Sequence, residues 1–330
     1  MSRYTLGCFG KLPIHSDFIR FQVIGNEIRM LDQWVQEGIY YAKARLGQKW
    51  KETFHNAETW SFLFRPAASP SFLIGVFCPS RDRSGRSYPF FLFLRVDKSV
   101  FGAPIYFAPL CFDLFLKEAQ GIAQTQWNGF DLSTFLSRLK DFSVPAPIDA
   151  DLIREDYLQY IEHQTSRYFW TRLFGDFKDS KKYQLYRNLI DVLLPMRGES
   201  ANTLGFGLKF PLTPQPLITE ERNEKCDIAF WFDLSSKFLK IEEDFFVFWQ
   251  RHSGKSTPAM LAFFSFPTPK QFLSLLQPDQ NHDAWFNLVS EGAFDPGTLR
   301  GDLREDRTAL LEDEVLSMAG FLAATGHIKP

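Results

Sequence analysis

Apolar residues in this chain follow two kinds of pattern, and each predicts a different element. In Asn26–Leu46 they recur every three or four residues, the period of an amphipathic helix. Phe72–Cys78 and Phe90–Val96 are almost continuously apolar and rich in aromatic and β-branched residues, which is typical of strands buried on both faces. Trp60–Arg65 has large rings at alternate positions, and Tyr4–Pro13 begins as a short strand before its turn residues. This order predicts a mixed α/β fold whose sheet is largely antiparallel.

The rest of the chain adds more elements of both kinds. Helical patterns lie at Cys111–Gln126, Asp131–Phe142, Asp151–Trp170, Ser180–Leu194, Thr268–Gln277 and Thr308–Ala324. Strand patterns lie at Thr203–Phe210, Asp227–Leu234, Phe245–Gln250 and Ala259–Phe266. The helices of the middle region are expected to cover one face of the sheet or to form a partly separate lobe.

Composition narrows the class of protein. The 330 residues are 45% hydrophobic and 23% charged, as in a folded soluble protein, and the 36 phenylalanines predict an aromatic-rich core. A net charge of −2 argues against a general nucleic-acid binder. The four cysteines are scattered without a C-x-x-C pair, which predicts neither a zinc site nor a disulfide framework but a reduced, cytoplasmic protein. No apolar run of about 18 residues is present, so we expect no membrane insertion.

The most polar short segment, Pro79–Pro89, separates two of the most apolar ones, and we call it the arginine loop. Its three arginines and one aspartate, Asp82, give a local formal charge of +2, and Gly85 permits a tight turn. Clustered guanidinium groups can receive a phosphate or a carboxylate. They can equally tie the sheet edge to carboxylates such as Asp17, and we favour this structural role.

Two other motifs suggest chemistry. His15, Ser16 and Asp17 are consecutive, and a hydrolase or transferase would use His15 and Asp17 with the arginines as an anion clamp. Consecutive residues rarely converge on one reacting atom, so a loop in which Asp17 accepts backbone hydrogen bonds is favoured. Ser253–Thr257 resembles the end of a phosphate-binding loop, but Trp249 stands where the first glycine is required. We therefore expect no cofactor and no metal.

Five short motifs together resemble one known family. They are Gly7–Pro13, Ser16–Ile19, Leu31–Trp34, Trp60–Leu63 and Pro79–Pro89. No single motif is distinctive, but their order and spacing are similar to those of the TagF family of bacterial type VI secretion accessory proteins.

This resemblance implies a fold and a function. The expected fold is a three-layer α/β/α sandwich with additional helices, divided into a TagF-like N-terminal α/β region (1–145), a helical region (146–225) and a C-terminal α/β region that completes the fold (226–330). The expected function is that of a cytoplasmic, non-enzymatic regulator that represses type VI secretion post-translationally. Its expected partner is the forkhead-associated scaffold protein of the secretion apparatus. The oligomeric state stays open.

We combine these expectations in one hypothesis about the site. Lys11, Asp17, Asp82, Arg83 and Arg86 form a polar cluster where the N-terminal loop meets the arginine loop. This cluster either contacts a partner or fixes the loops that do. The alternatives are a phospho-ligand or anion-binding module, and the hydrolase described above.

Overall fold

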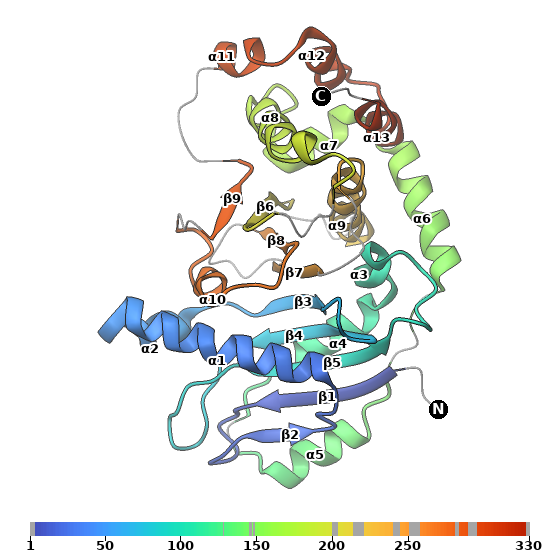
Figure 1. The fold of residues 1–330 in the computed structure, drawn as a ribbon. Coiled ribbons are helices and arrows are strands. Elements are labelled where there is room, and N and C mark those ends of the chain that lie inside the picture. The colour runs from blue at the N-terminus through green and yellow to red at the C-terminus, as the bar shows by residue number, and fades with distance from the viewer. Residues whose placement is uncertain are drawn as a thin grey trace.

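A single sheet runs through the molecule, as Figure 1 shows. The computed structural model describes residues 4–127, 129–144, 147, 149–199, 204–213, 221–239, 245–250, 258–280, 284–289 and 296–327. Within these residues the sheet has nine strands in the order β2-β1-β5-β4-β3-β7-β8-β6-β9. Their bounds are β1 Tyr4–Gly10, β2 Ile19–Phe21, β3 Trp60–Arg65, β4 Ser71–Cys78, β5 Phe90–Asp97, β6 Gly207–Pro211, β7 Phe245–Gln250, β8 Ala259–Phe263 and β9 Trp285–Asn287.

Strands from the N-terminal and C-terminal parts of the chain pair in this one sheet. β3 pairs with β7, so the C-terminal strands extend the sheet begun by the N-terminal ones. β6, from the middle of the chain, lies between β8 and β9. Every neighbouring pair is antiparallel except β6 with β9, which confirms the prediction of a mixed, largely antiparallel sheet.

Helices cover both faces of the sheet (Figure 1). One face is covered by α1 Asn26–Leu46, α2 Trp50–Asn56 and α10 Pro269–Leu276, and the other by α3 Ala108–Cys111, α4 Asp113–Ala123, α5 Leu132–Lys140 and α9 Glu221–Ser236. The remaining helices gather beyond the C-terminal strands and are α6 Ala150–His163, α7 Ser166–Phe174, α8 Lys181–Leu193, α11 Pro296–Gly301, α12 Glu305–Glu312 and α13 Met318–Gly326. Three short 3₁₀ turns lie at Gly47–Lys49, Ile105–Phe107 and Leu194–Met196.

Side chains of the central strands alternate between two hydrophobic cores. In β5, Phe90, Leu92 and Leu94 enter the core beneath α4 and α5, whereas Phe91 and Phe93 enter the core beneath α1. This is the period-two alternation of a strand, here with apolar residues on both faces because helices cover both. The predicted three-layer arrangement is therefore confirmed.

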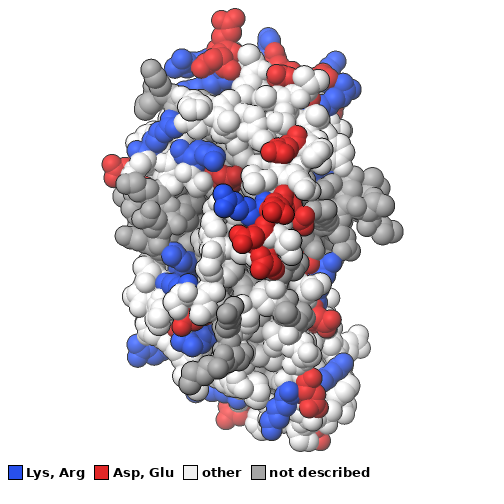
Figure 2. All heavy atoms as spheres, turned by 90° about the vertical axis from the view of Figure 1, so that its right-hand side faces the viewer, with Lys and Arg blue, Asp and Glu red and all other residues white. Residues whose placement is uncertain are grey.

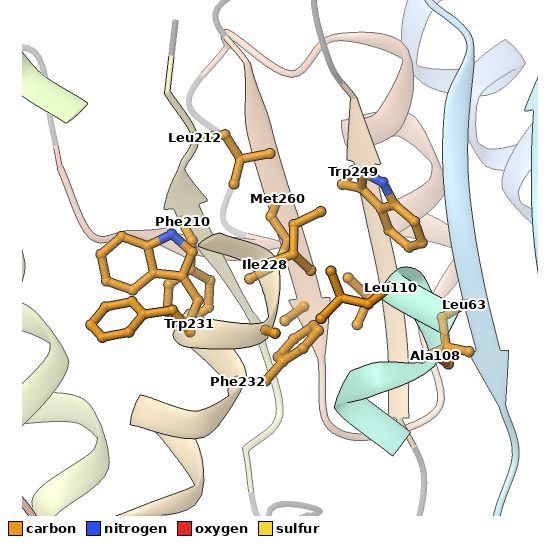
Figure 3. Close-up of a cluster of buried hydrophobic side chains, with 14 of the residues drawn as sticks. Leu63, Ala108, Leu110, Phe210, Leu212, Ile228, Trp231, Phe232, Trp249 and Met260 are labelled. Atoms are coloured by element: carbon orange, nitrogen blue, oxygen red, sulfur yellow. The ribbon is translucent and has the colours of Figure 1, made fainter. Parts of the chain in front are cut away.

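One predicted strand is wrong. Asp227–Leu234 lies inside α9, where Ile228, Trp231 and Phe232 pack against Met260 and other residues of the strands (Figure 3). A helix buried on nearly all sides has no polar face, so its sequence is as continuously apolar as that of a buried strand.

Two predicted helices are each divided into two. Asp151–Trp170 is divided between α6 and α7, and Thr308–Ala324 between α12 and α13. The two interruptions pair with each other through an antiparallel bridge between Thr165 and Ser317. Each of these residues also accepts a hydrogen bond from the first turn of the helix that follows it. This pairing joins distant segments, so no local pattern indicates it.

Candidate functional site

Two loops meet at one end of the sheet, on the left-hand side of Figure 1. The N-terminal loop, Lys11–Phe18, connects β1 to β2, and the arginine loop, Pro79–Pro89, connects β4 to β5. Because β1 pairs antiparallel with β5, with Phe9 opposite Phe91, the end of β1 and the start of β5 are neighbours. The topology therefore places both loops at the same edge, and we call the surface they form the loop rim.

Gly10 lets the loops approach closely. It has a φ of 128°, and a Cβ atom there would collide with the main chain of Pro89 and Phe90. Only glycine combines this backbone conformation with the absence of a side chain. Residues of the first and last TagF-like motifs thus touch directly.

Asp82 is the centre of the loop rim. It is 2% exposed, and its Oδ2 accepts hydrogen bonds from Lys11 Nζ at 2.9 Å and from Arg86 Nε at 2.7 Å. Its Oδ1 accepts the main-chain N–H of Arg86 at 2.9 Å. Burial acts to raise the pKa of the Asp82 carboxyl, but the donors on Lys11 and Arg86 outweigh it and lower the pKa to about 2. Asp82 is therefore ionised at neutral pH.

The arginines of the loop also bind main-chain carbonyls of the N-terminal loop. Arg83 Nη2 donates to the carbonyl of Ile14 at 2.5 Å, and the Arg83 N–H donates to the carbonyl of His15 at 2.9 Å. The guanidinium of Arg86 donates to the carbonyl of Ser16. The planar guanidinium suits such multiple donation. The two loops are consequently fixed to each other.

An aromatic contact extends the loop rim toward α1. The Tyr88 hydroxyl donates to the Asp32 carboxylate on α1, and the Tyr88 ring meets the edge of Phe18 with centroids 4.6 Å apart. Lys11 Nζ lies 5.4 Å from the centroid of the Phe18 ring. Burial, together with the Asp32 charge, raises the pKa of Tyr88. Sequence reasoning missed Asp32 and Tyr88 as a pair, although both belong to TagF-like motifs.

The structure brings together four of the five residues of the predicted cluster. Lys11, Asp82 and Arg86 form one ionic group, and Arg83 lies beside it on the same loop. Whether this cluster binds a partner stays a prediction. The side chain of Arg81 is exposed and has no hydrogen bond or ion pair within the described part of the chain, so it is available for an external contact.

Asp17, the fifth residue, belongs to the N-terminal loop but has a different contact. Its carboxylate is exposed and accepts the N–H of Phe18 at 2.7 Å, and among described residues it has no contact with the arginines. His15 contributes its carbonyl to Arg83. Neither His15 nor Asp17 lines the cavity between β2 and α1 or the one beside Tyr40 and Pro269. The acid–base hypothesis stays a prediction.

Other candidate features lie elsewhere or outside the described residues. The phosphate-loop-like motif Ser253–Thr257 lies outside them. Among the residues described, no cluster of three or more His, Cys, Asp or Glu is placed to hold a metal ion, and no helix has the length and hydropathy to span a bilayer. All four cysteines are buried and form no disulfide. The side of the molecule away from the loop rim carries both acidic and basic side chains, with a group of acidic ones near its centre (Figure 2).

Comparisons with known proteins agree with this architecture. Residues 7–142 match the TagF N-terminal domain, described as type VI secretion system-associated. No curated protein matches the chain. The crystal structure of PA0076 from Pseudomonas aeruginosa PAO1 at 2.05 Å resolution has a similar fold, with a TM-score of 0.51 and 14% sequence identity over 86% of this chain and 98% of that one. Residues 7–142 therefore form a region similar to the TagF N-terminal domain, which is type VI secretion system-associated.

Proposed function

We propose that this protein is a cytoplasmic, non-enzymatic regulator that represses type VI secretion post-translationally by binding the forkhead-associated scaffold protein of the apparatus. The loop rim is the proposed contact surface. The observation that supports it most is that two loops of the TagF domain are fixed to each other around Asp82 while arginine side chains remain at the surface. Four of the five residues of the predicted cluster take part in the contacts that hold this region together.

The chemistry of the loop rim favours binding over catalysis. A general base needs a free carboxylate with a pKa near the working pH. Asp82 instead has a pKa lowered to about 2, and both of its oxygens are occupied by donors from Lys11 and Arg86. A carboxylate with these contacts fixes the conformation of the two loops. A surface that is ordered before binding loses less conformational entropy on association.

The exposed arginines favour a protein partner. Arg81, Arg83 and Arg86 have exposed side chains within one short loop. Arginine is enriched in protein interfaces because its guanidinium makes several hydrogen bonds and packs on flat apolar groups. We therefore expect the loop rim to contact a complementary acidic surface of the scaffold protein.

Two loop variants test the proposal. Arg81→Glu reverses an exposed charge without removing any described contact, whereas the double variant Arg83→Ala/Arg86→Ala removes the contacts that fix the loops. Both are expected to lower co-purification of the scaffold protein and to raise secretion in cells. Arg154→Glu, which reverses an exposed arginine of α6 that has no hydrogen bond or ion pair among the described residues, is the matched control and is expected to act as the unmodified protein does.

The outcomes separate two failures. If the unmodified protein neither retains the scaffold protein nor lowers secretion, the proposed function is wrong. If the unmodified protein does both, and all three variants have native circular dichroism and match it in scaffold co-purification and secretion, the function stands. The loop rim is then not the contact surface.

A further inference from the structure

A small cavity opens beside the loop rim, between β2 and the first turns of α1. It has a volume of about 180 Å³. Phe9 and Ile28 form part of its apolar wall, and its charged lining residues are Arg20, Arg29 and Asp32. Pockets for whole small molecules are larger, at roughly 300–1,000 Å³. This cavity therefore fits the end of one side chain.

The two arginines of this cavity have no carboxylate partner in the part of the chain that the structure describes. Arg20 lies over the Phe18 ring, 5.8 Å from its centroid, and Arg29 Nη2 donates to the side-chain oxygen of Asn26 at 2.6 Å. Both arginines are exposed and come from different elements. Two guanidinium groups that line one cavity and have no ionic partner favour an anionic ligand.

The remaining charge of the cavity selects the kind of anion. Two guanidinium groups and the Asp32 carboxylate leave a formal charge of +1. A single carboxylate neutralises this charge. A phosphate dianion would instead leave an excess negative charge close to Asp32, and like charges in a confined site repel.

We propose that this cavity binds a single Asp or Glu side chain of the partner protein, inserted between the guanidinium groups of Arg20 and Arg29. The inference rests on the proposed function, because it assigns the partner an acidic segment that crosses from the loop rim to α1. Contacts already described make this surface continuous: Arg20 lies over Phe18, Phe18 contacts Tyr88, and Tyr88 binds Asp32.

A peptide titration tests the site without the scaffold protein. The probe is the blocked peptide acetyl-Gly-Glu-Gly-amide, added to the isotope-labelled full chain and followed by amide chemical shifts. We expect saturable shifts at residues lining the cavity and none with the corresponding Gln peptide. Arg20→Gln and Arg29→Gln are each expected to weaken binding by about tenfold or more.

Two further variants sharpen the assignment. Arg45→Gln, at the other end of α1, is exposed and is expected to leave the affinity unchanged. Asp32→Asn keeps an acceptor oxygen for Tyr88 but raises the charge of the cavity to +2. It is therefore expected to improve binding of a third probe, the phosphoserine peptide acetyl-Gly-phosphoserine-Gly-amide, at pH 7.5, where phosphate is close to a dianion.

Three results would overturn the assignment. They are equal binding of the Glu and Gln peptides, stronger binding of the phosphoserine peptide than of the Glu peptide to the unmodified chain, and an equal loss of affinity in Arg45→Gln. Unchanged thermal midpoints exclude misfolding as the cause. Because the scaffold protein is absent from this titration, a negative result combined with intact scaffold binding rejects the cavity and leaves the proposed function standing.

Discussion

Asp82 and Asp227 are both almost fully buried and both bind an arginine, yet the pKa values of their carboxyls move in opposite directions. Asp82 lies at the loop rim, where Lys11 and Arg86 bind it and lower its pKa to about 2. Asp227 lies in the helical interior, where it binds Arg172, and its pKa is raised. The difference shows that an Asp–Arg contact alone does not define the role of a carboxylate.

The surroundings of the two carboxyls explain why their pKa values move in opposite directions. Asp227 on α9 is bound by Arg172 of α7, by the Tyr160 hydroxyl at 2.7 Å and by the Thr213 hydroxyl at 2.9 Å. Burial raises its pKa more than these partners lower it. The Arg172 side chain is 7% exposed, whereas the Arg86 side chain is 58% exposed. The interior pair therefore joins α9 to α7 inside the core, while the loop rim keeps cations at the surface.

The largest effect is expected from breaking the interior pair. Asp227→Ala leaves the Arg172 guanidinium buried without its carboxylate, which costs about 3–5 kcal/mol of the free energy of unfolding. Urea denaturation of the full chain measures this loss. Combining Asp227→Ala with Arg172→Met is expected to recover part of the stability, because the uncompensated charge is removed. A double variant that is less stable by the sum of both single losses would contradict this account.

Removing Asp82 is expected to cost less. Asp82→Ala leaves the buried ammonium of Lys11 without its carboxylate, at about 1.5–3 kcal/mol, while the guanidinium of Arg86 can turn to solvent. Amide hydrogen exchange is expected to accelerate in both loops and to stay unchanged in α9. If exchange accelerates across the whole sheet instead, Asp82 supports the fold as a whole and the loop rim is not a separate unit.

Regular elements were predictable from sequence wherever one physical signal dominated. The period of α1 and the ring-rich patterns of β3 and β7 gave both ends of each element correctly. The strand predicted at Asp227–Leu234 failed because α9 is apolar on nearly all sides. The interruptions near Thr165 and Ser317 were not predicted, because each is stabilised by pairing with the other, more than a hundred residues away.

The candidate site was predictable only in part. Charge and position identified the arginine loop, and four of the five residues of the predicted cluster do lie together. The acceptors of Arg83 and Arg86 include main-chain carbonyls, which every residue has and no sequence pattern distinguishes. Asp17 was expected to face the arginines, but Asp32 on α1 contributes to the surface through Tyr88 instead.

Acidification is expected to weaken the loop rim and not the interior pair. Because the folded-state pKa of Asp82 is depressed, its stabilisation is present above the unfolded value near 3.8 and is lost as the pH falls toward about 2. The pKa of Asp227 is raised, so acid favours its folded, protonated form and its contribution has the opposite sign. The stability difference between the unmodified chain and Asp82→Asn should therefore shrink between pH 4 and pH 2 in urea titrations. A difference that stays constant would exclude Asp82 as the titrating group.

The smallest effect is expected from Arg81, and its comparison with Arg86 separates binding from structure within one loop. Arg81 is exposed and makes no described side-chain contact, so Arg81→Ala should change the free energy of unfolding by less than about 0.5 kcal/mol. Arg86→Ala should cost about 1 kcal/mol, since its bonds to Asp82 and Ser16 are partly screened by solvent. If Arg81→Ala weakens scaffold binding but leaves the free energy of unfolding unchanged, the loop rim contacts the partner through a charged side chain that does not stabilise the fold. Equal destabilisation by the two variants would instead mean that Arg81, too, fixes the loop.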